Sequence, residues 1–278
     1  MTQVWLITGA HRGLGRAVAD AAAEAGHTVV ATARDVAQLA AWQAMNPARR
    51  GAVQMDVTDG ASIAIGVRSA LSSFGRIDVL VNNAGYGQLG AFEEISEEQI
   101  SAQFDANVFG LMKVTREVLP TMRAQRRGRI FNIASMAGYK GGDRYAVYAA
   151  SKFAVAGFSE SLAAEVAAFG IFVTSVAPGF FRTDFLDASS VSHADGHVAD
   201  YTEDSTRKRA MLTNLNRQQA GDPRLLGAAL VQLATAAAPP VHFLVGADAV
   251  RAVRERSEAL LAEIARFEAL SSATAFKT

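Results

Sequence analysis

The sequence predicts an α/β fold: one doubly wound domain whose parallel sheet has about seven strands, with helices on both faces. Short apolar runs rich in β-branched residues alternate with longer helix-like segments through most of the chain. That alternation is typical of βαβ crossovers, which build a parallel sheet buried on both faces. No linker-like shift in composition divides the 278 residues, so we expect a single domain.

The expected strands are short apolar runs bounded by glycine, proline or polar residues, as strands of a buried sheet usually are. In chain order they are Val4–Thr8, Thr28–Ala33, Ala52–Met55, Asp78–Asn82, Arg129–Ala134, Phe172–Ala177 and His242–Val245.

The expected helices lie between these runs, and several end at a glycine or an Asn-Pro pair, which are common helix stops. They are Leu14–Ala25, Val36–Met45, Ala61–Phe74, Glu97–Leu119 with a continuation past Pro120 to Arg126, Ala146–Phe169, a helix that begins at Pro223, and Ala249–Leu270. Between the sixth strand and Pro223, the stretch Arg182–Asp222 has no obvious strand. A stretch of that length inside a compact domain usually forms a lid or a binding loop.

Composition excludes several classes of function. The chain has no cysteine, so disulfides, thiolate metal sites and cysteine nucleophiles are absent. Lys+Arg and Asp+Glu number 27 each, so no overall field favours nucleic acid or an anionic membrane. The N-terminus lacks a signal-peptide pattern, and the apolar stretch Leu225–Val241 is broken by Gln232 and Pro239-Pro240. We therefore expect a cytoplasmic protein without a membrane span.

One group of residues imitates a metal site. His193 and His197 lie close together in the sequence, with Asp195 and Asp200 nearby. The segment is rich in small and polar residues and has no helical frame that would hold these side chains on one face. We expect no metal there.

A glycine-rich turn follows the first strand, with the sequence Thr8-Gly9-Ala10-His11-Arg12-Gly13-Leu14-Gly15. Glycines at such a turn allow a sharp bend and a close approach to a pyrophosphate, and the N-terminus of the next helix favours an anion. The Gly-x-x-x-Gly-x-Gly spacing differs from the commonest dinucleotide fingerprint. Its position between a strand and a helix nevertheless predicts nucleotide binding.

The residues at the end of the second strand indicate which nucleotide binds. An NAD site usually has an acidic residue there, whereas arginine accommodates the 2′-phosphate of NADP. The sequence has Ala33 and then Arg34, and Arg12 can approach the same phosphate. Both arginines can instead be solvated surface residues, and Asp35 can act as a displaced acid. We favour NADP(H) over NAD(H).

Further along, polar or small residues follow each later strand. Asp56 and Val57 follow the third strand, where a carboxylate can reach the adenine amino group. The fourth strand leads into Asn83-Ala84-Gly85, a turn that can bring backbone close to the cofactor, and Ser135 follows the fifth. The carboxyl ends of parallel strands form the ligand crevice of a doubly wound sheet.

Tyr148 and Lys152 lie four residues apart in a predicted helix, so their side chains share one face. A nearby lysine charge can stabilise a phenolate and make tyrosine useful as an acid or base. Such pairs are also common on solvated helix faces, so the pair carries weight only together with Ser135 and the glycine turn.

These motifs, in this order, resemble the classical short-chain dehydrogenase/reductases, which have a Rossmann-type fold. The resemblance covers the chain from the first strand to about Thr183. The matching residues are the glycine turn, Asp56, Asn82-Asn83-Ala84-Gly85, Asn107, Ser135, Tyr148, Lys152, Pro178-Gly179 and Thr183. The turn Gly221-Asp222-Pro223 and the segment Val245–Asp248 look like the subgroup akin to 17β-hydroxysteroid dehydrogenases.

The resemblance implies a role for each matching residue. Tyr148 would be the general acid in carbonyl reduction, and Ser135 would hold the carbonyl oxygen. Lys152 would bind the nicotinamide ribose and lower the pKa of Tyr148, while Asn107 would anchor a water that links Lys152 to solvent. Pro178-Gly179 and Thr183 would bracket the nicotinamide.

The same resemblance divides the single domain into three parts. Residues 1–181 would form the cofactor-binding and catalytic core, residues 182–222 a substrate-binding lid segment, and residues 223–278 the last strand and C-terminal helices.

Apolar and aromatic residues dominate the expected substrate cleft. Besides Ser135 and Tyr148, we expect Ala137, Phe180, Phe185 and Tyr201 to bind substrate. A hydrophobic ketone or aldehyde, with the corresponding alcohol, is the expected substrate class.

Three alternatives stay open: an NAD-dependent alcohol or hydroxysteroid dehydrogenase that works oxidatively, a catalytically silent dinucleotide sensor, and a nucleotide-sugar epimerase or dehydratase. The ~95 residues after Thr183 leave little room for the substrate domain of the last class. The resemblance also implies a homodimer or homotetramer, formed through helix 146–169 with Phe153, Val155, Phe158 and Leu162 on its exposed side.

Overall fold

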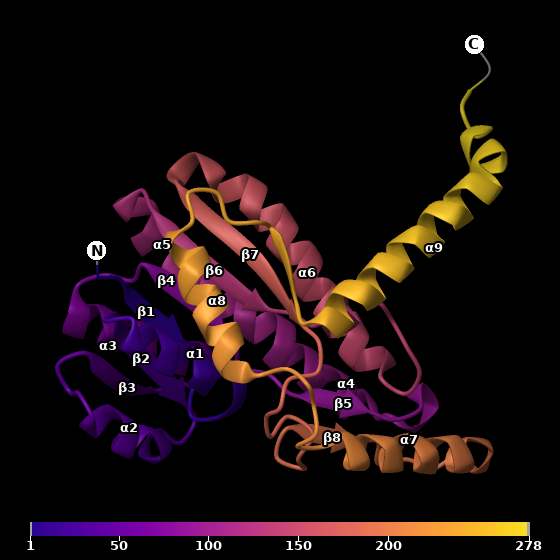
Figure 1. Cartoon of the computed structure of the whole chain (residues 1–278), viewed down its shortest axis with the longest axis horizontal. Helices are drawn as coiled ribbons and strands as arrows, with labels where there is room; N and C mark the ends of the chain where they lie inside the picture. The colour runs from indigo at the N-terminus through magenta and orange to yellow at the C-terminus, as the bar shows by residue number, and fades with distance from the viewer. Residues whose placement is uncertain (1, 277–278) are drawn as a thin grey trace.

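The computed structural model describes residues 2–276 and contains a seven-stranded parallel sheet with helices on both faces (Figure 1). The order of the strands is β3-β2-β1-β4-β6-β7-β9, which confirms the predicted fold class. The strands are β1 Val4–Ile7, β2 Thr28–Ala33, β3 Arg50–Gln54, β4 Val79–Asn82, β6 Gly128–Ile133, β7 Ile171–Pro178 and β9 His242–Val245.

Nine α-helices occur in the described chain, joined by short 3₁₀ turns. They are α1 Gly13–Glu24, α2 Ala40–Ala44, α3 Gly60–Phe74, α4 Glu97–Phe104, α5 Leu111–Gln125, α6 Ala146–Val166, α7 Thr202–Leu215, α8 Pro223–Thr235 and α9 Ala247–Ser272. Two predicted helices are divided. Residues 36–45 form a 3₁₀ turn followed by α2, and the long helix predicted over 97–126 is interrupted by a π-helical turn at Asp105–Gly110. The continuation through Pro120 is confirmed.

Strand side chains point alternately to the two faces of the sheet and so build two separate cores. One core packs β1 residues Trp5 and Ile7 against α1 and α8, with Val18 and Leu230 fully buried. The other packs the intervening strand residues, among them Leu6, against α3, α5 and α6. Both faces are therefore covered, as a parallel sheet requires.

A second, two-stranded sheet joins the region after β4 to the lid segment. Here β5 Gly87–Leu89 pairs in parallel with β8 Val191–His193. We expected no strand between Arg182 and Asp222, so that expectation is wrong at β8. Each of these strands has only three residues, too few for the alternation that identifies a strand in a sequence. Helix α7 follows β8 and lies below the carboxyl edge of the main sheet in Figure 1.

Helix α6 packs on the sheet more closely than we expected. Val155 and Leu162 belong to the buried cores, whereas Phe153 is 46% exposed. The expected exposed face is therefore wrong at Val155 and Leu162. Within residues 2–276, none of the helices combines the length and apolarity that a membrane span needs.

The close packing of α1 on the sheet gives a test of the fold. A Cβ atom at Gly15 would overlap Asn83 Nδ2 and lie 2.6 Å from the Gly9 carbonyl oxygen. We expect Gly15→Ala to lower the free energy of unfolding by ~1–3 kcal/mol, because the crowded backbone has to shift. Urea unfolding measures the change.

The matched control is Gly60→Ala at the start of α3, where nothing lies within 4 Å of the added Cβ. That variant should be neutral or more stable by ~0.4–1 kcal/mol. Equal effects at the two glycines would contradict the packing argument.

Candidate active site

The carboxyl ends of the sheet strands open onto a cleft of about 1040 Å³ that contains most of the predicted site residues. Those that line it are Gly9, His11, Arg12, Gly13, Leu14, Arg34, Asp56, Val57, Asn83, Ala84, Gly85, Ser135, Ala137, Tyr148, Lys152, Pro178, Gly179, Phe180, Thr183 and Phe185. Three predicted residues are not among them: Gly15, Asn107 and Tyr201. Residues as far apart in the sequence as Gly9 and Phe185 thus meet at one edge of the sheet.

The glycine turn is held to strand β4 by a cluster of hydrogen bonds. The Thr8 hydroxyl accepts from the backbone N–H groups of Asn83 and Ala84, both at 3.0 Å. The Asn83 side chain in turn donates to the carbonyls of Thr8 and Gly9 at 2.9 and 3.0 Å. These bonds fix the turn against the neighbouring strand, and Asn83 is a positioning residue of the cleft.

The turn has the properties of a phosphate site. Gly9 and Gly13 have φ angles of +62° and +57°, a region that favours glycine. Helix α1 begins at Gly13 without a side-chain cap, so its first N–H groups face the cleft free of an internal acceptor. An anion such as a pyrophosphate fits these donors and the positive end of the helix dipole.

Arg12 does not extend freely toward that anion. Its guanidinium forms an ion pair with Asp184 at 3.2 Å and hydrogen bonds to the side chain and carbonyl of Ser189, both in the lid segment. The predicted phosphate ligand is therefore bound to the lid in this structure. Nothing in the sequence near Arg12 indicates this contact, because Ser189 is 177 residues away.

Arg34 is exposed and lines the cleft, without a hydrogen bond or ion pair to any residue in the described chain. Its neighbour Asp35 caps the following 3₁₀ turn by accepting from Ala37 N at 3.1 Å, and it also accepts from Gln38. A carboxylate engaged as a cap is poorly placed to bind a ribose. The Arg34 guanidinium is thus free to bind a ligand, whereas the Asp35 carboxylate is already engaged by Ala37 and Gln38.

Ser135, Tyr148 and Lys152 come together where β6 ends. Ser135 follows the strand, and its hydroxyl accepts from Ala137 N at 3.1 Å. Tyr148 and Lys152 lie on α6, which packs against β7 and against the 3₁₀ turn that follows Ser135. The Lys152 ammonium donates to the Ile133 carbonyl at 2.8 Å and lies 5.8 Å from the centre of the Tyr148 ring.

Burial shifts both titratable groups. It raises the pKa of the Tyr148 hydroxyl to about 12, although a hydrogen bond with Ser135 acts in the opposite direction. It lowers the pKa of the Lys152 ammonium to about 8. The lowering of the Tyr148 pKa that we expected from Lys152 is not found in this structure, because the loss of hydration around the phenol outweighs other contributions.

Asn107 lies behind the cleft, on the π-helical turn between α4 and α5. It is 1% exposed. Its amide accepts from Tyr86 N at 3.0 Å and donates to Tyr86 O at 2.9 Å, and it also approaches the Ser151 hydroxyl at 3.3 Å. Asn107 therefore joins the turn after β4 to helix α6 beside Lys152. The π-turn was missed, although such turns often mark functional sites.

The end of β7 is tied to the beginning of α9. The Asp248 carboxylate accepts from Phe180 N at 2.7 Å, and a side chain at Gly179 would overlap that carboxylate. Thr183 is buried, and its hydroxyl accepts from Phe185 N at 3.2 Å. The backbone at Gly179 and Phe180 is thus held by Asp248 of the last helix, whereas Thr183 is fixed by a local bond.

Phe185 forms a wall beside Tyr148, with the two ring centres 6.0 Å apart. Phe180 and Ala137 lie on the same cleft. Tyr201, by contrast, lies outside the cleft, so that expectation is wrong. Its ring packs under the Arg144 guanidinium at 4.8 Å, and the nearby Glu93 carboxylate raises the pKa of its hydroxyl.

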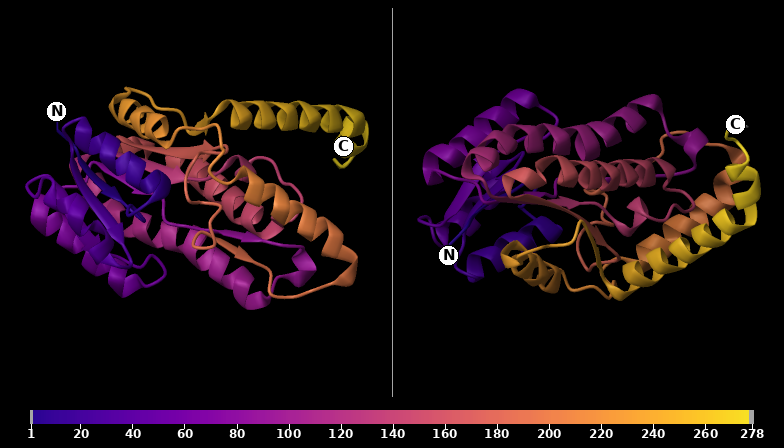
Figure 2. Two further views of the ribbon diagram at one scale, coloured as in Figure 1. Left: turned by 60° about the horizontal axis from the view of Figure 1, so that its bottom comes forward. Right: turned by 90° about the horizontal axis from the view of Figure 1, so that it is seen from above.

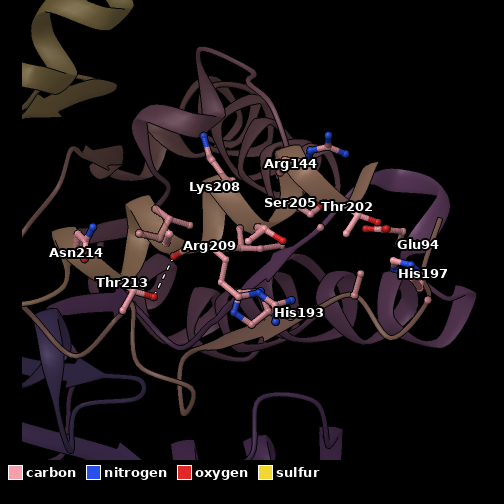
Figure 3. A pocket seen from close by; sticks show the side chains of 17 residues that line it. Glu94, Arg144, His193, His197, Thr202, Ser205, Lys208, Arg209, Thr213 and Asn214 are labelled. Atoms are coloured by element: carbon pink, nitrogen blue, oxygen red, sulfur yellow. Dashed lines mark hydrogen bonds between the residues drawn. The ribbon is translucent and has the colours of Figure 1, made fainter. Parts of the chain in front are cut away.

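A second cavity of about 600 Å³ lies between the small sheet and α7 and shares Leu89, Arg144, His193, Lys208 and Leu212 with the main cleft. Figure 3 shows Arg209 reaching toward His193 on one side of the helix, while Lys208 leaves it on the other. Burial and the Arg209 charge lower the pKa of His193. In the described part of the chain, no three His, Asp or Glu side chains gather as a metal site needs.

The lid contacts are the part of the site that sequence reasoning missed. Arg144 pairs with Asp204 at 3.4 Å, and Lys208 lies 5.6 Å from the centre of the Tyr145 ring. Met211 and Leu212 of α7 also line the cleft. The positive φ of Arg144, +64°, is a backbone conformation that the sequence does not indicate.

Comparison with known proteins decides the family. The family model described as short chain dehydrogenase matches residues 3–193. The chain belongs to the short-chain dehydrogenase family. As a member of that family it is an oxidoreductase that uses a nicotinamide dinucleotide, NAD(H) or NADP(H).

Relatives within the short-chain dehydrogenase family cover nearly the whole chain. The 3-ketodihydrosphingosine reductase of Bacteroides thetaiotaomicron is 39% identical over 88% of each chain. A short-chain dehydrogenase of Streptomyces avermitilis has a crystal structure with a TM-score of 0.91 and 38% identity, covering 99% of this chain and 100% of its own. A short-chain dehydrogenase/reductase of Burkholderia phymatum, solved in complex with NAD, has a TM-score of 0.83 and 27% identity over 94% and 95%.

The buried amine of this dehydrogenase gives a prediction about stability and pH. Lysine in the unfolded chain titrates near 10.4, whereas Lys152 in the folded protein has a pKa of about 8. Between these values the unfolded state binds the extra proton, so Lys152 makes the wild type relatively more stable as the pH rises. Relative to Lys152→Met, the wild type should gain free energy of unfolding, on the order of 3 kcal/mol, between pH 7 and pH 10.

Urea unfolding of both proteins at several pH values measures this difference. The control is Lys140→Met, which removes a lysine whose side chain is 44% exposed and should give a flat difference. A flat difference for Lys152→Met as well would show that the buried amine titrates as in water.

Proposed function

We propose that the protein is an NADP(H)-dependent carbonyl reductase that converts a hydrophobic ketone or aldehyde to the alcohol. The observation that carries the proposal is the placement of Ser135, Tyr148 and Lys152 along one cleft, with the Phe185 ring beside Tyr148. A half-buried proton donor beside an apolar wall suits a neutral carbonyl substrate.

When bound, the nicotinamide supplies the hydride, and the protein supplies orientation and the proton. The Tyr148 hydroxyl, kept protonated by its burial, donates its proton to the carbonyl oxygen. Ser135 hydrogen-bonds that oxygen and polarises the carbonyl. Lys152 binds the ribose and holds a positive charge near the phenolate that forms, so it stabilises Tyr148 only as the proton leaves.

The free Arg34 and the occupied Asp35 support NADP(H) as the cofactor. The adenine would lie near Asp56 and Val57, the pyrophosphate over residues 9–15, and the nicotinamide between Gly85 and Thr183. The relative solved with NAD keeps NAD(H), and with it an oxidative dehydrogenase, as the second candidate.

The named relatives support a keto substrate, since one is a 3-ketodihydrosphingosine reductase. We also keep the 17β-hydroxysteroid-dehydrogenase-like subgroup, the division at residues 181 and 222, the cytoplasmic location and a homodimer or homotetramer as proposals. A silent dinucleotide sensor is the third candidate, but a sensor has no use for a proton donor such as Tyr148.

The role of Tyr148 is tested by Tyr148→Phe. Loss of the proton donor should lower kcat at least ~100-fold, while the dissociation constant for NADPH changes less than about threefold. Steady-state rates with a panel of aromatic and alicyclic ketones, and fluorescence titration with NADPH, measure the two quantities.

Tyr145→Phe is the control, because this tyrosine also lines the cleft but has no lysine four residues on. It should keep kcat within a few-fold. Retention of more than about a tenth of kcat by Tyr148→Phe would overturn the assignment, and a wild type that binds NADPH but reduces no carbonyl would favour the sensor.

The cofactor preference is tested by Arg34→Gln. Loss of a charge-assisted hydrogen bond, worth ~1.5–3 kcal/mol, should weaken NADPH binding about 10- to 100-fold and leave NADH binding unchanged. Arg49→Gln is the control, since Arg49 donates to the Gly26 carbonyl and is not among the cleft residues. Tighter binding of NADH than of NADPH by the wild type would replace this proposal with the NAD alternative.

A further inference from the structure

The last helix of the chain leaves the body of the protein. Helix α9 runs over 26 residues, and Ala249 is its one buried residue. Every residue from Ser257 to Phe276 is exposed. Figures 1 and 2 show the helix extending away from the sheet toward the C-terminus. Most helical stability in proteins comes from the packing of an apolar face, and the outer part of α9 packs on nothing in the described chain.

The exposed part of α9 carries an apolar stripe. Its large apolar side chains recur at intervals of three and four residues, which places them on one face. They are Leu260, Ile264 and Phe267, with exposed fractions of 43%, 54% and 46%, continued by Val250 and Val253 toward the body. Leu261 and Leu270 lie beside the stripe and are 65% and 72% exposed. A stripe of this spacing is the seam of a helix pair.

Charged residues along α9 are distributed unequally. Beside the stripe, Arg254 and Arg256 lie in the half nearer the body, whereas Glu263 and Glu268 lie in the outer half. The other charged residues of α9, which are Asp248, Arg251, Glu255, Glu258 and Arg266, do not flank the stripe on its outer part. Arg254 and Glu268 flank one side of the stripe, and Arg256 and Glu263 flank the other, in the positions that decide partner and orientation in coiled coils.

The charges beside the stripe are complementary between two copies of α9 only if the two helices run antiparallel. In a parallel pair, Glu263 of one copy would face Glu268 of the other, and like charges repel. In an antiparallel pair, the flanking arginines Arg254 and Arg256 of each helix face the flanking glutamates Glu263 and Glu268 of the other. We infer that α9 is a dimerisation arm that pairs antiparallel with α9 of a second copy of this chain, an inference independent of the proposed reaction.

The base of the arm is fixed, so the stripe is presented in a definite direction. Asp248 accepts from Phe180 N at 2.7 Å, and Glu255 pairs with Lys140 at 3.7 Å. A membrane surface fits the arm less well, because anionic lipids attract a basic amphipathic helix and the outer half of α9 is acidic. The arm begins beside Gly179, and the stripe runs outward from there, away from the cleft.

The first experiment compares self-association of the full chain by sedimentation equilibrium. Ile264→Glu combined with Phe267→Glu places two charges in the stripe and should weaken the dimer at least ~100-fold, since each charge would be buried without a partner. The matched control is Ala262→Glu combined with Ala269→Glu, which adds the same charges to the opposite face of the same helix and should leave association unchanged. All four positions are exposed, and circular dichroism confirms that both variants fold.

The second experiment tests orientation. Arg254→Glu alone and Glu268→Arg alone should each weaken the dimer, and the two changes together should restore it, because the swapped charges again face each other. Since the natural chain has no cysteine, an equimolar mixture of Arg254→Cys and Glu268→Cys proteins should form the mixed disulfide in preference to either self-linked product.

Three outcomes would overturn the proposal. They are a wild type that stays monomeric at 50 µM, a stripe variant that associates as tightly as the control, or a preference for self-linked disulfides. Sedimentation of the wild type with phosphatidylglycerol vesicles, lost in the stripe variant while the protein stays monomeric in solution, would assign the arm to a membrane surface instead.

Discussion

One hydrogen bond sets the geometry of the active site, the bond from the buried Lys152 ammonium to the Ile133 carbonyl at 2.8 Å. A buried charge is costly unless a polar group receives it, and a carbonyl at the end of a strand is an acceptor that the sheet leaves free. The bond holds α6 against the carboxyl edge of the sheet, and with it Tyr148. Burial lowers the pKa of Lys152 and raises the pKa of Tyr148 in the resting protein. The charge of Lys152 therefore stabilises Tyr148 only when the phenolate begins to form.

The fold was predictable because it follows from strong local patterns. Two strands, β2 and β9, begin and end where the sequence places them, and the glycine turn is recognisable from its spacing. What could not be predicted depends on contacts between distant residues. Strands β5 and β8 have three residues each and pair across about a hundred positions. Neither run is long enough to carry a periodicity, so their pairing is decided by the tertiary structure alone.

The catalytic residues were easier to predict than the residues around them, because their proximity is also encoded locally in the sequence. Tyr148 and Lys152 are four residues apart on one helix, so their proximity is local information. The position of Asn107 depends on a π-helical turn that inserts an extra residue into the helix, and no residue type there requires it. Tyr201 was predicted to bind substrate because it is aromatic and follows the site in the sequence, but its ring packs against the Arg144 guanidinium. Residues that are close in the sequence could be assigned to the site, whereas the direction of a side chain in residues 182–222 could not be predicted.

Residues 182–222, the proposed lid, are held weakly in the cleft. Helix α7 has no buried residue, and its contacts with the core are polar: Arg144 with Asp204 at 3.4 Å and Lys208 over the ring of Tyr145. An ion pair with a half-exposed partner and a cation–π contact at the surface contribute about 0–1 kcal/mol each, far less than the apolar packing of α1 or α5. Local opening of α7 therefore costs a small part of the global stability. Arg12 adds a contact at the other end of the segment, through Asp184, so a lid that opens also releases a guanidinium beside the phosphate-binding turn.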